Sequence, residues 1–163
     1  MSTITLQPIG VIRTPYQRIE GMPIQPSGAA ETTGQVILED AYADGLADLE
    51  GFSHIYLIYL FHFSKGFELR IKPFLDDQRR GVFATRAPRR PNPIGLSVVA
   101  LVRREANVLH VRGIDVVDQT PLLDIKPYVP AFDAPASVRV GGLEKAARRS
   151  ARVRSDGRFK DTL

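Results

Sequence analysis

The sequence predicts a single, mainly β domain that is either a barrel or a sandwich. The chain has 163 residues, a length that suits one domain of ordinary size. It runs through a series of short segments rich in β-branched and aromatic residues, each bounded by Gly, Pro or Asn. Little helix-forming sequence separates these segments, which favours a barrel or a sandwich over a doubly wound α/β sheet.

Seven segments are expected to form strands. In chain order they are residues 4–13, 35–38, 54–62, 81–85, 97–102, 108–111 and 123–125. The third and fifth of these are apolar almost throughout, so we expect both of their faces to be buried. The longest strictly apolar run, Ile55–Phe61, is far too short to cross a bilayer.

Two further stretches favour helix. The first, residues 41–49, follows Asp40, a good N-cap residue, and ends before a glycine. The second, residues 143–153, is strongly basic, and its apolar face is thin because most of its apolar residues are alanines. We therefore divide the chain into a β domain over residues 1–138 and a basic C-terminal helix or tail over residues 139–163.

Composition excludes several kinds of protein. Hydrophobic residues make up 44% of the chain and charged residues 25%, the balance of a globular protein rather than a disordered one. There is no cysteine, which excludes disulfide bonds, a thiol nucleophile and a thiolate metal site. The N-terminus lacks the basic start and apolar core of a secretion signal, so we expect a cytoplasmic protein that does not bind membranes.

Charge is segregated along the chain. The formal net charge is +4. Residues 65–90 and residues 139–163 each contain eight Lys or Arg and three Asp or Glu, whereas the rest of the chain is net acidic. Two basic segments on an acidic body favour a polyanionic partner; the alternative is a solvated face and a soluble tail.

Common cofactor and catalytic signatures do not occur in the sequence. It contains no G-x-G arrangement, no phosphate-binding G-x-x-x-x-G-K-[ST] and no G-x-S-x-G nucleophile elbow. The three histidines, His54, His62 and His110, do not have the spacing of metal ligands, so we expect no metal. The usual hydrolase and oxidoreductase interpretations are therefore disfavoured.

One segment is dense in polar residues, namely residues 83–96 (FATRAPRRPNPIGL). It places Arg86, Arg89, Arg90 and Asn92 among prolines that restrict the backbone. Arginines on a stiff segment lose little entropy when they bind an anion, and their planar side chains suit phosphate or carboxylate. The segment predicts an anion-binding site; the alternative is a stiff surface loop that joins two strands.

A second polar segment, residues 115–128 (DVVDQTPLLDIKPY), carries Asp115, Asp118 and Asp124. Asp118 is in a position to accept a hydrogen bond from a ribose hydroxyl, and Asp124 to serve as a base or an orienting group. The alternative is a turn whose Asp and Thr side chains bond to their own backbone. His62, which ends the third expected strand, is either functional or a strand-end histidine with a structural partner.

Six motifs, taken in order, resemble those of a known family. They are PIGVIRTP at residues 8–15, LEGFSH at 49–54, His62, GVFATR at 81–86, RPNPIGLS at 90–97 and DIKPY at 124–128. Together they resemble the TsaA-like family, also called the TrmO type, over about residues 4–130. Members of that family are S-adenosylmethionine-dependent methyltransferases that act on tRNA.

The resemblance implies a fold, an assembly and a reaction. The fold is a single β-barrel, and the assembly is a homodimer that binds its cofactor, S-adenosyl-L-methionine, near the subunit interface. The reaction methylates N6 of N6-threonylcarbamoyladenosine, the modified purine beside the anticodon of tRNA. Larger relatives carry a second C-terminal domain, and the basic residues 139–163 are expected to help hold tRNA in its place.

The family's donor-binding positions fall on a few short stretches of this chain. They are Pro23, Ile24 and Gln25, His62 and Phe63, Arg86, Leu96, and Asp118, Gln119, Thr120 and Pro121. Two of these residues depart from the family pattern. Ile24 stands where many members have Arg, which removes a carboxylate contact. Gln119 stands where the turn usually has Gly, which either alters the turn or brings an amide near the donor.

The same resemblance suggests roles for the site residues. We expect Arg86 to bind the carboxylate of the donor, Leu96 to pack on its adenine and Asp118 to bind its ribose. The residues expected to contact the substrate are Arg89, Arg90 and Lys126. The residues expected to take part in catalysis are Asn92, Asp124 and Tyr128. Asp124, Tyr128 and His62 are alternatives for the general base.

Two other functions stay open. One is a methyltransferase of the same fold that acts on a small molecule or another nucleoside, which would account for the departures at Ile24 and Gln119. The other is a non-catalytic RNA-binding barrel. The first would transfer methyl groups without tRNA, and the second would bind tRNA without donor-dependent turnover.

Overall fold

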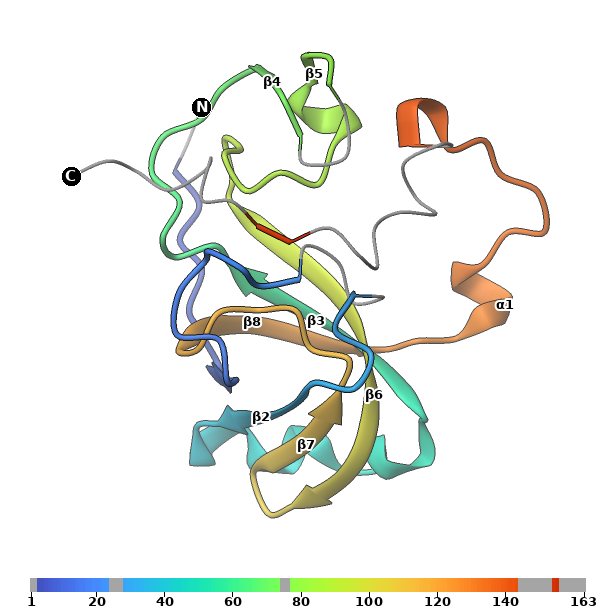
Figure 1. The fold of residues 1–163 in the computed structure, drawn as a ribbon. Helices are drawn as coiled ribbons and strands as arrows, with labels where there is room; N and C mark the ends of the chain where they lie inside the picture. The colour runs from blue at the N-terminus through green and yellow to red at the C-terminus, as the bar shows by residue number, and fades with distance from the viewer. Residues whose placement is uncertain (1–2, 24–27, 74–76, 144–153, 156–163) are drawn as a thin grey trace.

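The protein folds as a closed, six-stranded antiparallel β-barrel (Figure 1). The computed structural model describes residues 3–23, 28–73, 77–143 and 154–155. The barrel strands are β1 (Gly10–Arg13), β2 (Thr33–Leu38), β3 (His54–Leu60), β6 (Ile94–Glu105), β7 (Val108–Arg112) and β8 (Thr120–Pro127). They follow the order β1–β2–β7–β6–β3–β8 around the ring, and β8 pairs again with β1. The predicted mainly β class is confirmed, and the barrel is the form it takes.

The short strand β1 closes the barrel because it pairs with β2 on one side and with β8 on the other. Gly10 lies opposite Leu38 in the first ladder and opposite Leu122 in the second. A Cβ atom at position 10 would lie 2.2 Å from the carbonyl oxygen of Ile37, so glycine is what lets β1 approach β2. Of the strand expected over residues 4–13, only β1 forms.

Inward-facing side chains of the six strands fill the barrel. On β3, Ile55, Leu57 and Tyr59 are buried, and the residues between them are partly exposed. The buried core consists of Ile12, Val36, Leu38, Leu46, Ile55, Leu57, Tyr59, Val99, Leu109, Val111, Ile114, Val116 and Leu122. The expectation that the third and fifth strands are buried on both faces is wrong for this chain. A barrel encloses one face of each strand; on the other face Val102 of the fifth expected strand is 58% exposed, and Tyr56 and Ile58 of the third are partly exposed.

A small lobe lies outside the barrel, between β3 and β6 in the sequence and at the top of Figure 1. It holds a two-stranded sheet of β4 (Arg70–Ile71) and β5 (Arg80–Gly81) and a small core of Ile71, Val82 and Ala87. We call the described residues between 64 and 90 the β4–β5 lobe. The strand expected over residues 81–85 is wrong beyond Gly81, because Val82–Ala84 form a 3₁₀ turn.

The first expected helix forms as two 3₁₀ helices rather than as one α-helix. They span Asp40–Leu46 and Leu49–Gly51. Asp48, between them, has a left-handed backbone conformation (φ 65°) that interrupts any regular right-handed helix. Asp40 is the first helical residue rather than the N-cap, and its carboxylate accepts a hydrogen bond from the Asn107 side-chain amide (2.9 Å).

Two short helices follow β8 in the described residues, α1 (Pro130–Asp133) and a 3₁₀ turn over Gly141–Leu143. Apart from Leu143, the second expected helix (residues 143–153) lies outside the described residues. Within the part of the chain that the structure describes, every helix is too short or too polar to traverse a bilayer.

The C-terminal region returns to the segment that follows β1. Arg154 forms an isolated antiparallel bridge with Pro23. Ser155 accepts a backbone hydrogen bond from Gly21 (2.8 Å) and donates one to Met22 (2.9 Å). These two residues of the expected C-terminal tail therefore lie against the body of the protein, next to the site described below.

Candidate functional site

A largely apolar cavity of about 530 Å³ lies at the end of the barrel where β3 finishes and β6 starts. Its wall also includes residues from the segment after β1, the β4–β5 lobe and the turn before β8, and Ser155 completes it. This volume suits a ligand of nucleoside size. Among the described residues, no group of three or more His, Asp or Glu side chains is arranged to hold a metal ion.

More than half of the residues expected to bind the methyl donor line this cavity. They are Pro23, His62, Phe63, Arg86, Leu96 and Thr120. Ile24 and Gln25 lie outside the described residues. Asp118, Gln119 and Pro121 flank Thr120 in the sequence but are not part of the cavity wall.

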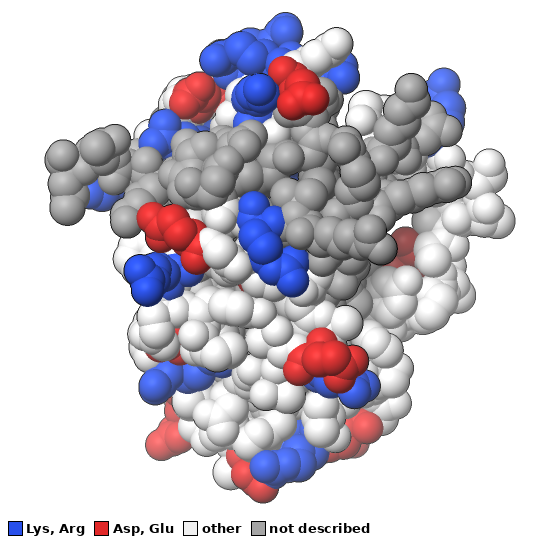
Figure 2. Space-filling view, in the orientation of Figure 1, with Lys and Arg blue, Asp and Glu red and all other residues white. Residues whose placement is uncertain are grey.

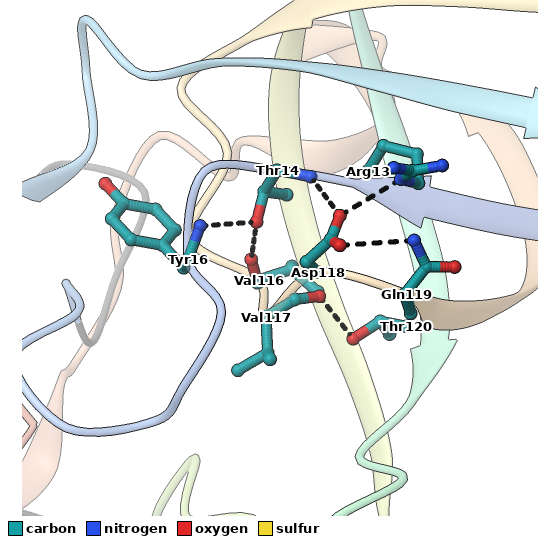
Figure 3. Close-up of polar contacts among 8 residues, drawn as sticks. All are labelled: Arg13, Thr14, Tyr16, Val116, Val117, Asp118, Gln119 and Thr120. Atoms are coloured by element: carbon teal, nitrogen blue, oxygen red, sulfur yellow. Dashed lines mark hydrogen bonds and ion pairs between the residues drawn. The ribbon is translucent and has the colours of Figure 1, made fainter.

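Asp118 ties the turn before β8 to the segment after β1 (Figure 3). Its carboxylate accepts hydrogen bonds from the Thr14 backbone N–H (2.9 Å), the Arg13 Nε (3.3 Å) and the Gln119 side-chain amide (3.1 Å). Burial opposes ionisation, but the hydrogen bonds and the charge of Arg13 outweigh it and lower the pKa of Asp118. Asp118 borders a separate polar hollow beside Arg13 and Thr14, so its contact with a ribose stays a prediction.

Gln119 has the backbone conformation of a glycine. Its φ is 64°, in the left-handed region that favours glycine. Its side-chain amide donates to Asp118 and so takes part in the link between the two segments (Figure 3). The substitution of the usual glycine therefore keeps a left-handed turn and adds a hydrogen bond beside it.

His62 and Thr120 meet on the cavity wall. The Thr120 hydroxyl donates to the Val117 carbonyl (2.7 Å), and its oxygen lies 3.3 Å from Nδ1 of His62. Burial lowers the pKa of His62, although a hydrogen bond with the Leu60 backbone opposes the shift. The imidazole is therefore neutral at neutral pH, as a proton acceptor has to be.

A polar chain beside the cavity, formed by Tyr59, Ser97 and Asp115, was not predicted. The Tyr59 hydroxyl lies 3.0 Å from Ser97 Oγ, and the Ser97 hydroxyl donates to Asp115 (2.7 Å). Burial raises the pKa of Asp115 to about 6, although the Ser97 hydrogen bond and the charge of Arg86 oppose the shift. The sequence displays Asp115 as one of three aspartates, but its partners depend on the register of β3 against β6, which pairs Tyr59 with Gly95.

The proline-rich segment is braced by Arg90. Its Nη1 donates to three backbone carbonyls of the same loop, those of Val82, Thr85 and Ala87 (3.2, 2.9 and 3.2 Å). Its guanidinium also lies 5.9 Å from the centre of the Phe83 ring. The stiffness predicted from the prolines therefore has a second source in this side chain.

Two other arginines of the β4–β5 lobe share one acidic partner. Glu68 forms ion pairs with Arg89 (3.1 Å) and Arg79 (3.4 Å). These contacts give Arg89 a structural role in the lobe. Contacts of Arg89 and Arg90 with a substrate stay predictions.

The remaining expected site residues do not line the cavity. Asn92 is exposed in the turn before β6. Asp124 on β8 forms an ion pair with Lys126 (2.7 Å). Tyr128 packs edge-on against Tyr56 of β3, with 5.6 Å between the ring centres. Their proposed parts in catalysis and substrate binding stay predictions.

An apolar surface connects these residues to the cavity. On the outside of the barrel, Ile58 of β3 lies opposite Leu96 of β6 on one side and opposite Asp124 of β8 on the other. Leu60 and Ile94 form the next pair toward the cavity. We call these outward residues of β3, β6 and β8 the outer face. Because Leu96 belongs both to the outer face and to the cavity wall, the two are continuous.

The fold and the site define a class of protein, a closed antiparallel barrel with a largely apolar cavity of nucleoside size at one end. Comparison with known proteins then identifies the family. The chain belongs to the tRNA-methyltransferase O N-terminal domain family, whose model matches residues 11–134. The resemblance found in the sequence motifs is thereby confirmed.

Relatives in several organisms share this similarity. A probable S-adenosyl-L-methionine-binding protein of Pyrococcus abyssi is 50% identical over 156 residues, which cover 96% of this chain and 85% of that protein. The tRNA (adenine(37)-N6)-methyltransferase of Escherichia coli is 39% identical, over 80% of this chain and 60% of the enzyme. The crystal structure of TrmO from Pseudomonas aeruginosa superposes with a TM-score of 0.73 at 42% identity, covering 86% of this chain and 62% of that one. The chain thus spans less than two thirds of these last two proteins.

Proposed function

We propose that this protein is an S-adenosylmethionine-dependent methyltransferase that methylates N6 of N6-threonylcarbamoyladenosine beside the anticodon of tRNA. The cavity carries the proposal, because six residues expected to bind the donor meet on its wall. The names of two relatives support the two parts of the proposal, which are binding of the donor and methylation of tRNA. One is named for binding S-adenosylmethionine, and the other for methylating adenine 37 of tRNA.

The residues of the cavity fit the donor. Arg86 provides a guanidinium for a carboxylate, and Leu96 and Phe63 provide apolar surface for a purine. When bound, S-adenosylmethionine supplies a methyl group that is already activated on a positively charged sulfur. The protein then has to hold the acceptor nitrogen in line with that methyl group and to accept a proton.

The acceptor nitrogen is a poor nucleophile because it is conjugated both to the purine and to the carbamoyl group. The carbamoyl group also makes its N–H more acidic, so a proton acceptor restores its nucleophilicity. Of the three candidates for this base, His62 lies on the cavity wall and is neutral. Asp124 lies on the outer face, Tyr128 follows β8 and packs against Tyr56, and Asn92 is proposed to orient the threonylcarbamoyl group from the turn before β6.

We infer that the protein forms a homodimer through the outer face. Ile94 and Leu96 are 40% and 49% exposed there, and Phe63 beside them is 49% exposed. Apolar side chains that gather on one face of a monomer favour a protein interface. A second copy seated on this face would border the cavity at Leu96 and would lie near Asp124.

The β4–β5 lobe is the surface that we propose for tRNA. Figure 2 shows Lys and Arg side chains gathered at the end of the molecule where β4 and β5 lie. Exposed apolar side chains lie among these cations, with Phe67 at 55%, Leu69 at 60% and Phe83 at 74% exposure. Cations bind phosphates and exposed aromatic rings stack on unpaired bases, a combination suited to an anticodon loop.

The test is incubation with methyl-labelled S-adenosylmethionine and two pools of tRNA, one of which comes from cells that cannot make threonylcarbamoyladenosine. Resolved nucleosides should carry label on the modified adenosine of the first pool only. Donor binding without label in either pool would contradict the tRNA reaction. It would favour a methyltransferase of the same fold that acts on a small molecule, and labelling of another nucleoside in both pools would favour one that acts on that nucleoside.

A further inference from the structure

Among the described residues that line the cavity, Asp115 is the one carboxylate. The positive charges on the same wall are those of Arg86 and Arg90, and Arg90 directs its Nη1 to three backbone carbonyls. His62, also on the wall, is neutral because burial lowers its pKa. The largely apolar cavity therefore presents one negative group and, in Arg86, one positive group that acts on it electrostatically.

Asp115 is held in a fixed position. The Ser97 hydroxyl donates to its Oδ1 (2.7 Å), and the Tyr59 hydroxyl lies 3.0 Å from Ser97 Oγ. Tyr59 is itself fixed by its neighbour on β6, because its ring occupies the space next to the Cα atom of Gly95. Two barrel strands thus aim the carboxylate, and a group held in this way loses little entropy when it binds a ligand.

A cationic ligand stabilises an ionised carboxylate that lies in a largely apolar cavity. Burial raises the pKa of Asp115 to about 6, so the group is ionised at neutral pH but less stable in that form than it would be in water. A cation that enters the cavity restores part of the lost stabilisation and forms a charge-assisted hydrogen bond.

We propose that Arg86 and Asp115 together recognise the amino-acid end of the methyl donor, Arg86 through the α-carboxylate and Asp115 through the α-ammonium group. This inference rests on the proposed function, since it takes S-adenosylmethionine as the ligand. It adds a donor-binding residue outside the positions that the sequence motifs indicated. It also gives the Tyr59–Ser97–Asp115 chain a role, which is to orient the carboxylate.

The test measures the dissociation constants of three ligands by calorimetry at pH 7.5, for the wild type, Asp115→Asn and Asp44→Asn. The ligands are S-adenosylmethionine, S-adenosylhomocysteine and methylthioadenosine, which has the nucleoside and the sulfur but no amino-acid part. Asp44 is exposed on a 3₁₀ helix, so Asp44→Asn removes the same charge away from the cavity. Asp115→Asn should weaken the first two ligands equally, by about tenfold or more, and leave methylthioadenosine unchanged.

Other outcomes contradict the proposal in distinct ways. If Asp115→Asn lost affinity for S-adenosylmethionine alone, the carboxylate would pair with the sulfonium. An equal loss for all three ligands, or no loss at all, would make Asp115 a structural residue. If the wild type binds neither S-adenosyl compound, the proposed function itself fails, and this inference fails with it.

A pH series gives a second readout that a structural role would not move. The affinity of the wild type for S-adenosylhomocysteine should fall as the pH drops from 7.5 to 5, because Asp115 becomes protonated around pH 6 while the ligand's ammonium group stays charged. Tyr59 stays protonated in this range because burial raises its pKa, and Asp118 stays ionised because its pKa is lowered. His62, on the same wall, has a pKa lowered by burial, so any dependence on pH that remains in Asp115→Asn belongs to His62 rather than to Asp115.

Two variants sharpen this readout. Asp115→Asn should flatten the dependence on pH. Ser97→Ala should move its midpoint to higher pH, because the Ser97 hydrogen bond holds the pKa of Asp115 down. A wild-type affinity that does not change between pH 7.5 and 5, or an unchanged midpoint in Ser97→Ala, would overturn the assignment.

Discussion

Tyr59 and Gly95 face each other across β3 and β6, and the tyrosine ring fills the space that a side chain at position 95 would occupy. A Cβ atom built on Gly95 lies 2.1 Å from the ring. The pair is positioned at the inner end of the cavity, where it supports Ser97 and through it Asp115. Packing inside the barrel and the shape of the site therefore depend on the same glycine.

Gly95→Ala should lower the free energy of unfolding by about 1–3 kcal/mol, because the tyrosine ring has to move to admit a methyl group. It should also weaken donor binding, since the displaced ring no longer supports Ser97. Urea denaturation and calorimetry measure the two effects. Gly81→Ala is the matched control, because nothing lies within 4 Å of a Cβ atom there and its φ is −60°. Equal stability of the two variants would contradict the packing argument.

Position 119 tests the left-handed turn. Because φ is 64° at Gln119, a Gly variant should be more stable than an Ala variant by about 1 kcal/mol, as both lose the hydrogen bond to Asp118 and only Ala keeps the backbone strain. Urea denaturation of the two variants gives this difference. The order should reverse at Gln35, an exposed residue within β2, where Gly is less favourable than Ala.

Asp118→Asn should destabilise the protein by about 1–3 kcal/mol at pH 7, because the carboxylate accepts hydrogen bonds from Thr14, Arg13 and Gln119 in the folded state. The folded pKa of Asp118 lies below its ordinary value of 3.8, so the stabilisation is present above that value and is lost as the pH falls through the folded pKa. Unfolding curves between pH 7 and 2 should therefore show the wild type and the variant converging in acid. A gap that widens in acid would contradict the assignment.

The β4–β5 lobe can be tested apart from the cavity. Phe67→Ala and Lys65→Gln should each weaken tRNA binding several-fold while the dissociation constant for the donor stays unchanged, because both residues are exposed outside the cavity wall. Lys65→Gln should also lower the slope of log affinity against log salt by about one unit. Filter binding over a salt series measures both effects. Phe132→Ala, which removes an exposed ring on α1, is the control and should bind tRNA normally.

The proposed dimer interface on the outer face can be tested through the oligomeric state of a variant. Ile58→Arg places a charge in the middle of the proposed interface and should convert a dimer into a monomer in sedimentation experiments. Donor binding should weaken in parallel, since Leu96 next to Ile58 belongs to the cavity wall. Val102→Arg, at a residue of β6 that is 58% exposed, should keep the wild-type mass. Ile58→Arg and the wild type sedimenting alike would count against the interface.

Local sequence was enough to predict the positions of the barrel strands β2, β3, β6, β7 and β8, because β-branched and aromatic runs bounded by turn residues mark such strands. It failed for β4 (Arg70–Ile71), where two residues, one of them charged, carry no such signal. It also overestimated the helix after β2, because the left-handed residue Asp48 is not visible in a helical pattern.

The site was predicted less completely than the fold. Six of the residues expected to bind the donor line the cavity, but the motifs did not single out Asp115, which lines it as well. Asp115 lines the cavity together with Val116 and Val117, whereas Asp118, in the turn that follows, borders the separate polar hollow. Which aspartate faces which side depends on how the segment enters β8, and that depends on contacts between distant parts of the chain.

The four-residue strand β1 completes a ring in which each strand has a neighbour on both sides. A ring of this kind offers no free edge to which another strand can be added. The barrel sheet therefore cannot extend from one molecule into the next by strand pairing. Any association of two barrels has to rely on side chains that point away from the ring. Mutations at those positions can therefore change which molecules the protein associates with while its fold stays the same.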